Sequence, residues 1–60
     1  MTVMDLYLVL PENQVIYIED NAKELKSYSG MADDIPLELF NKNVVEVESL
    51  EDSIRYIACE

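Results

Sequence analysis

Residues 44–57 of the chain read VVEVESLEDSIRYI, a stretch in which valine and glutamate alternate before a short polar link and a second run of branched and aromatic residues. Alternation with a period of two is typical of a β-strand that is buried on one side only. The link formed by residues 50–52 has a length suited to a hairpin. We therefore expect two antiparallel strands here, at residues 44–49 and 53–59.

Two further strands are expected upstream. Residues 15–20 read VIYIED, and β-branched and aromatic residues of this kind are enriched in strands. The preceding residues 11–14 have the composition of a turn. Residues 24–29 alternate in the same way and predict a strand that closes at Gly30, where a positive φ is adopted without steric cost.

The remaining segments predict helical structure. Thr2 and Asp5 have the spacing of a capping box, apolar residues then recur on one helical face, and Pro11 would end the helix. Residues 6–10, LYLVL, also fit a buried strand, although the agreement between cap and proline favours a short helix over residues 3–10. Residues 31–41 indicate a loop with one or two helical turns.

These elements predict one α+β domain over residues 1–60. The fold is a small four-stranded, largely antiparallel sheet, with a short N-terminal helix and a short helical turn between two hairpins over one face. The strands carry apolar residues at both parities, so we expect an apolar patch that is left for a second chain. A chain of 60 residues buries only about 60% of its unfolded surface, so its stability is marginal and binding to a partner would increase it.

The charge of the chain points to the kind of partner. It has 13 acidic and 4 basic residues, a net charge of −9, and a hydrophobic fraction of 50% that is too high for a disordered acidic tail. Such a folded acidic protein repels nucleic acid and attracts basic surfaces. We expect a basic protein surface as the partner, with no direct binding to nucleic acid.

Catalysis, cofactors and membranes are not indicated. The chain has no histidine, no glycine-rich phosphate loop and no nucleophile motif, so we expect a non-enzymatic protein without a cofactor. Its acidic segments lack the ligand spacing of a calcium loop, so no metal site is expected. No apolar run reaches 18 residues and no signal-peptide pattern is present, which predicts a cytoplasmic protein with a reduced Cys59.

The acidic residues of the closing hairpin form the candidate site. On a strand, Glu46 and Glu48 project from one face about 6.6 Å apart, with Val45 and Val47 on the core side. Arg55 on the neighbouring strand is expected to moderate their charge. A row of carboxylates on a rigid sheet can imitate DNA phosphates, although a solvated strand face has the same alternation. The predicted partner-binding residues are Glu46, Glu48, Glu51, Asp52, Asp33 and Asp34.

The segments LPENQVIYIED (10–20) and DDIPLELFNKNVVEV (33–47), with the strand that closes the chain, resemble small acidic proteins encoded by phages and mobile elements of low-GC bacteria. The resemblance covers nearly the whole chain and contains no catalytic motif. Members with known roles are often inhibitors of bacterial defence, including anti-CRISPR proteins that occupy the nucleic-acid-binding surface of an RNA-guided nuclease. It therefore implies an inhibitor of a defence nuclease in the host bacterial cytosol, and it carries over no residue role.

The alternative is a structural or regulatory adaptor that homodimerises through an apolar sheet face, with the acidic residues serving only solubility. The two hypotheses differ in their response to salt. Charge-driven binding weakens as ionic strength rises, whereas an apolar dimer is insensitive to it.

Overall fold

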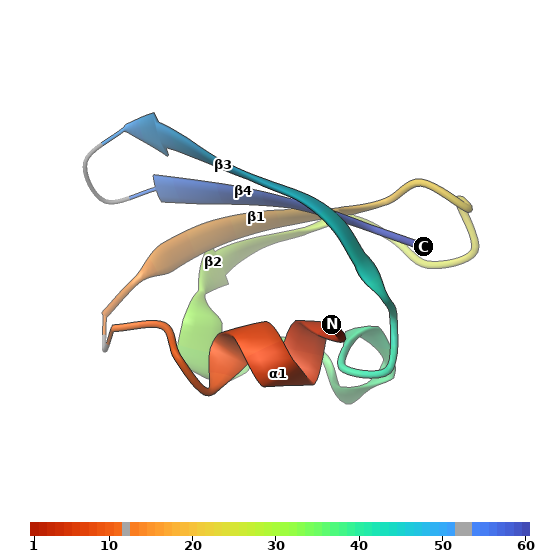
Figure 1. Ribbon diagram of the computed structural model, residues 1–60, viewed down its shortest axis with the longest axis horizontal. Coiled ribbons are helices and arrows are strands. Elements are labelled where there is room, and N and C mark those ends of the chain that lie inside the picture. Colours follow the sequence, from red (N-terminus) through yellow and green to blue (C-terminus); the bar gives the residue numbers. More distant parts are fainter. Residues whose placement is uncertain (12, 52–53) are drawn as a thin grey trace.

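The computed structural model describes residues 1–11, 13–51 and 54–60, with the side chain of Glu51 left out. Its elements, in chain order, are α1 (Val3–Tyr7), β1 (Val15–Asp20), β2 (Tyr28–Met31), the 3-10 turns η1 (Ala32–Asp34) and η2 (Leu37–Leu39), β3 (Val44–Glu51) and β4 (Ile54–Cys59). All four strands form one twisted sheet, and α1 lies across one side of it (Figure 1). The predicted α+β class is confirmed.

The sheet is mixed, with strand order β2-β1-β4-β3. The hairpins β1–β2 and β3–β4 are antiparallel as expected, whereas the central pair β1–β4 is parallel. A parallel pair needs a long crossover connection. Here the chain leaves β2, passes through η1 and η2 on the side of α1, and enters β3 at the far edge of the sheet (Figure 1).

The core lies between the sheet and the layer that contains α1, η1 and η2. Along β1, Ile16 and Ile18 are fully buried, while Val15 and Tyr17 on the opposite side are partly exposed. The buried cluster consists of Val3, Leu6, Ile16, Ile18, Ala32, Ile35, Leu39, Ile57 and Cys59. Burial raises the pKa of the Cys59 thiol, an effect that the nearby Asp20 carboxylate reinforces, so this thiol stays protonated and unreactive.

The N-terminal helix is held by the predicted capping box. The Asp5 amide donates to Thr2 Oγ1 at 3.3 Å, and the Thr2 amide donates to Asp5 Oδ2 at 3.1 Å. Residues 8–10 continue as a turn in which the Val9 amide donates to the Leu6 carbonyl. The segment that was open to two interpretations is therefore helical, and α1 is shorter than the expected residues 3–10.

The second strand begins four residues later than expected, at Tyr28, and ends at Met31. Residues 21–27 form a loop around the buried Asp20 carboxylate, which accepts hydrogen bonds from the amides of Ala22, Glu24 and Leu25. These bonds commit the amides to the loop and delay β2 to Tyr28. Gly30 then lies inside β2 with φ +151°, and a Cβ there would be 2.9 Å from the Tyr28 hydroxyl.

Candidate functional site

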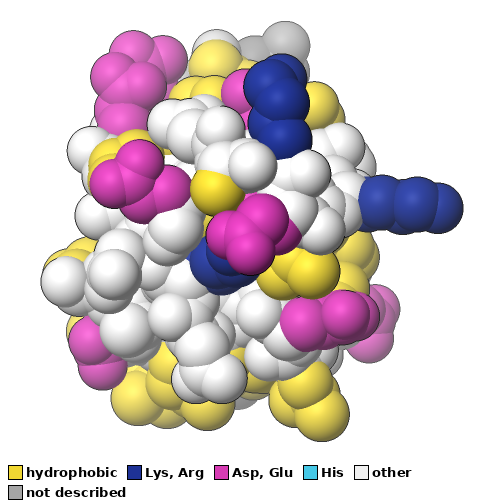
Figure 2. Space-filling model, turned by 90° about the vertical axis from the view of Figure 1, so that its right-hand side faces the viewer, with side chains coloured by type: hydrophobic (Ala, Val, Ile, Leu, Met, Phe, Trp, Pro, Cys, Tyr) yellow, Lys and Arg dark blue, Asp and Glu magenta, His cyan; other side chains and the backbone are white. Residues whose placement is uncertain are grey.

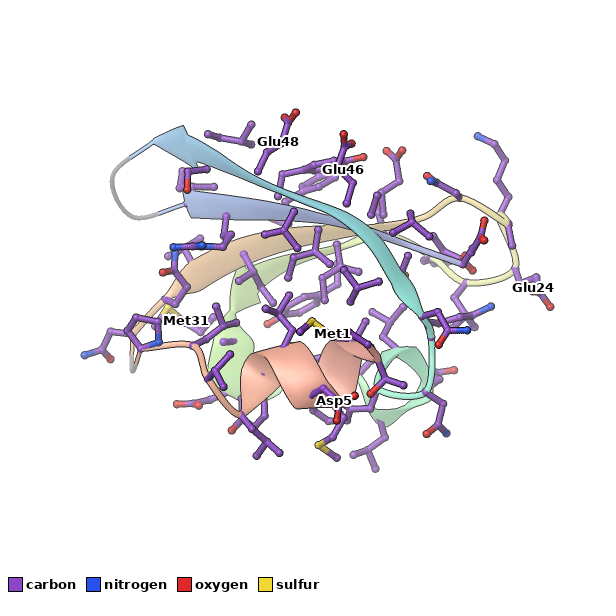
Figure 3. The ribbon with its side chains drawn as sticks, in the orientation of Figure 1. Met1, Asp5, Glu24, Met31, Glu46 and Glu48 are labelled. Carbon is purple, nitrogen blue, oxygen red and sulfur yellow. The ribbon has the colours of Figure 1, made fainter. Side chains whose placement is uncertain are left out.

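The side of the sheet that faces away from α1 is uncovered in the described structure, and we call it the open face. Glu46 and Glu48 point outward from it, away from the helix (Figure 3). Both side chains are exposed, and they pair across the hairpin with Ala58 and Tyr56. The prediction that Glu46 and Glu48 share a solvent-facing side of one strand is confirmed.

Cross-strand pairing arranges the open face in three rows that run across the strands. The first row is apolar and contains Met31, Val15 and Ile54. The second row is aromatic at its centre and contains Ser29, Tyr17, Tyr56 and Glu48. The third row is acidic at both ends and contains Glu19, Ala58 and Glu46. Among these side chains the acidic residues increase from the end of Val15 to the end of Glu19, and the position opposite Ile54 is Glu51, whose side chain lies outside the described residues.

Two tyrosines form the centre of this face. The rings of Tyr17 and Tyr56 stack with their centroids 5.9 Å apart and their planes 25° from parallel, and both side chains remain partly exposed. The Tyr56 hydroxyl donates to Glu19 Oε1 at 3.4 Å. Burial raises the pKa of Tyr56, and the negative charges of Glu19 and Glu46 raise it further. The tyrosine pair thus lies within the field of the carboxylates around it.

The open face contains no basic residue among its described positions. Arg55 lies between Ile54 and Tyr56 on β4 and pairs with Ser49 and Ile16, so its side chain belongs to the side of the sheet that faces α1. The prediction that Arg55 moderates the charge of the acidic row is wrong. Neighbouring residues of a strand face opposite sides, and the hairpin register places Tyr56 next to Glu48.

The lysines lie at one end of the molecule, around the loop between β1 and β2. Lys23 and Lys26 are exposed in the loop between β1 and β2, and Lys42 lies close to Glu24 of the same loop. In the view onto this end, basic and acidic side chains lie beside each other (Figure 2). The charge of the loop end is therefore partly balanced, whereas the charge of the open face is not.

The two valines beside the glutamates are less buried than expected. Val47 pairs with Ile57 on the side of the core but is 38% exposed, and Val45 lies at a β-bulge and is 49% exposed. Neither belongs to the buried cluster. The reason is that β3 is an edge strand, so its inner side is covered by fewer neighbours.

The structure does not bring all predicted contact residues together. Asp33 and Asp34 belong to η1 in the layer of α1, where the Tyr7 hydroxyl donates to Asp33 Oδ1 at 3.3 Å. They therefore lie on the other side of the sheet from Glu46. Glu51 pairs with Ile54 at the end of β3, but its side chain, like Asp52, lies outside the described residues.

One acidic residue of the open face was not predicted. Glu19 lies two residues after Tyr17 on β1 and flanks Ala58 from the side opposite Glu46. The sequence contains the signal, since Tyr17 and Glu19 have the same parity on a strand. The sequence does not show that β1 and β4 are neighbours, and this pairing is what brings Glu19 to the acidic row.

Among the described residues, the carboxylates of the open face do not line a hollow. The three carboxylates are exposed on a sheet surface, while two hollows of about 490 and 430 Å³ are lined by residues that do not belong to the open face. Within residues 1–11, 13–51 and 54–60, no group of three metal-ligating side chains is placed to hold an ion. The helix in the described part of the chain is too short to cross a membrane.

No protein-family model, curated protein or solved structure matches the chain. The candidate site is therefore defined by its own geometry and charge.

Proposed function

We propose that the protein is a non-enzymatic inhibitor that binds a basic, nucleic-acid-binding surface of another protein through its open face. The observation that carries this proposal is the set of three exposed carboxylates, Glu19, Glu46 and Glu48, around a tyrosine pair on a face without a described base. Lysine and arginine residues that bind DNA phosphates respond to negative charge irrespective of its source. Occupying such a surface would exclude the nucleic acid by charge and by bulk.

We assign the partner to the bacterial defence nucleases, including RNA-guided ones, and the site of action to the host cytosol. The resemblance to small acidic phage and mobile-element proteins supports this choice. So does the net charge of −9, because a nuclease must present an extended basic channel to its substrate.

The alternative of a homodimer through the sheet is less well supported. Two copies that met through their open faces would bring Glu46 and Glu48 close to the carboxylates of the second copy, and like charges across an interface are costly. The most exposed apolar side chains, which include Leu8, Val9 and Leu37, belong to or follow the elements of the helix layer.

The test compares two variants that change the net charge equally. Glu46→Gln/Glu48→Gln removes two charges from the open face, and Asp33→Asn/Asp34→Asn removes two charges from the helix layer. The tagged protein would be used to capture partners from a bacterial lysate at about 50 mM and about 500 mM NaCl, with and without competing duplex DNA.

We expect a nucleic-acid-binding protein that is retained at low salt and displaced by either treatment. The variant of the open face should bind it about tenfold more weakly, while the control variant should bind within about twofold of the wild type. Equal retention by both variants, or a partner that survives both salt and DNA, would refute the proposal.

A further inference from the structure

We infer that the open face selects arginine over lysine in its partner, with one guanidinium group stacked on Tyr56 and held by Glu46 and Glu48. This inference rests on the proposed function and adds the type of side chain that the face recognises. Its occupant is a basic protein segment, because the described positions of the face carry negative charge and no positive charge.

The tyrosine pair leaves one aromatic surface directed toward the glutamates. Tyr17 covers one side of the Tyr56 ring, with 5.9 Å between the ring centroids. The other side of the Tyr56 ring lies toward β3, where Glu48 is its direct cross-strand partner and Glu46 is the partner of the next residue in the row behind, Ala58. Aromatic surface and carboxylates are therefore adjacent.

This combination matches the chemistry of a guanidinium group. The group is planar, stacks on aromatic rings, and presents its N–H donors in a fork that fits a carboxylate. An ammonium group is a compact and strongly hydrated charge that gains less from a ring. Arginine can use the Tyr56 ring and the Glu46 or Glu48 carboxylate together, whereas lysine gains mainly from the carboxylate.

The ring is already held in place before a partner arrives. The Tyr56 hydroxyl donates to Glu19, and the ring stacks on Tyr17, so little side-chain freedom remains to be lost on binding. Glu46 and Glu48 stay exposed, and within the described residues neither forms an ion pair that a partner would have to displace. The face is thus preorganised at the ring and open at the carboxylates.

The experiment is a titration of the full chain with hexa-arginine and hexa-lysine by isothermal titration calorimetry. We expect the wild type to bind hexa-arginine about three- to tenfold more tightly than hexa-lysine. In Tyr56→Leu this ratio should fall to about one, while Tyr56→Phe, which keeps the ring, should retain it. Glu46→Gln/Glu48→Gln should weaken the binding of both peptides.

The outcomes separate this inference from the proposed function. Equal affinities of the wild type for the two peptides would overturn the arginine selectivity, and an unchanged ratio in Tyr56→Leu would overturn the stacking on Tyr56. Either result leaves the proposed function standing, provided that binding still depends on Glu46 and Glu48. Failure of the wild type to bind either peptide would overturn the proposed function as well. Circular dichroism would show whether Tyr56→Leu folds. If it does not fold, the ratio of the two affinities in the wild type still tests the arginine selectivity.

Discussion

At the scale of single residues, Asp20 shows how one buried carboxylate organises the chain around it. Its side chain is fully buried, and the Lys42 Nζ atom lies 3.4 Å from one carboxylate oxygen. Burial opposes ionisation, but the amides of Leu25 and Ala22 and the Lys42 ammonium outweigh it, so the pKa of Asp20 is lowered. The folded chain therefore holds Asp20 as a carboxylate.

The substitution Asp20→Asn is expected to lower the midpoint of thermal unfolding by about 10 °C or more, because the loop amides would lose a charged acceptor and Lys42 would lose a buried counterion. Thermal unfolding followed by circular dichroism measures this shift. Glu24→Gln is the control, since Glu24 contacts the same lysine at 3.0 Å but is largely exposed, and its loss should shift the midpoint by less than about 3 °C. Equal shifts in the two variants would show that the buried carboxylate has no special role.

The same residue predicts how stability depends on pH. Because the pKa of Asp20 is lower in the folded chain than in the unfolded chain, its contribution is fully present above the unfolded value of about 3.9 and is lost as the pH falls through the folded value. The difference in melting temperature between the wild type and Asp20→Asn should therefore be constant above about pH 5 and shrink below about pH 4. A difference that persists unchanged to about pH 2 would contradict this assignment.

At the scale of elements, the stability of α1 depends on its N-terminal capping box, because the helix itself is short. A helix of five residues is too short to persist without tertiary support, and Thr2 satisfies one of its free amides. Thr2→Ala is expected to reduce the free energy of unfolding by about 1 kcal/mol, measured by urea denaturation. Thr2→Ser keeps the hydroxyl and should change it by only a few tenths of a kcal/mol. No loss in Thr2→Ala would mean that backbone bonds, such as those from the Val3 amide to the Lys42 carbonyl and from the Met4 amide to the Phe40 carbonyl, are sufficient to hold the N-terminus.

The elements also show which parts of the fold could be predicted from sequence. Local signals were sufficient for the capped helix, for the strand at residues 15–20 and for the pairing of the closing hairpin, although β3 runs to Glu51 and so includes residues 50 and 51 that were expected in the link. The start of β2 was wrong because a side chain, Asp20, decides where the preceding loop ends. Local sequence patterns do not show that the Asp20 carboxylate binds the amides of Glu24 and Leu25.

The candidate site was predictable within one strand but not across strands. Glu46 and Glu48 follow from alternation along β3 alone. The sides occupied by Arg55 and Glu19 depend on the register of the hairpin and on the parallel pairing of β1 with β4, and a shift of one residue reverses the side of every residue in a strand. Pairings between segments far apart in the sequence are therefore what the structure adds.

At the scale of the whole molecule, the net negative charge lowers the stability of the fold and favours the proposed binding to a basic partner. The chain has a net charge of −9, its lysines lie at one end, and the acidic residues of the open face lack a described counterion there. Self-repulsion of this kind destabilises a compact state, and salt screens the repulsion between exposed charges that lie further apart than the Debye length, which is about 8 Å at physiological ionic strength.

We therefore expect the melting temperature to rise by a few degrees between about 10 and about 300 mM NaCl, while the affinity for a basic partner falls over the same range. Glu46→Gln/Glu48→Gln should show a smaller rise, because part of the repulsion is already removed. A melting temperature that falls with salt would mean that ion pairs such as Lys42 with Asp20 and Glu24 outweigh the repulsion. Salt should therefore raise the melting temperature and lower the affinity for the partner. This combination is expected if the charge of the open face contributes to binding and destabilises the fold.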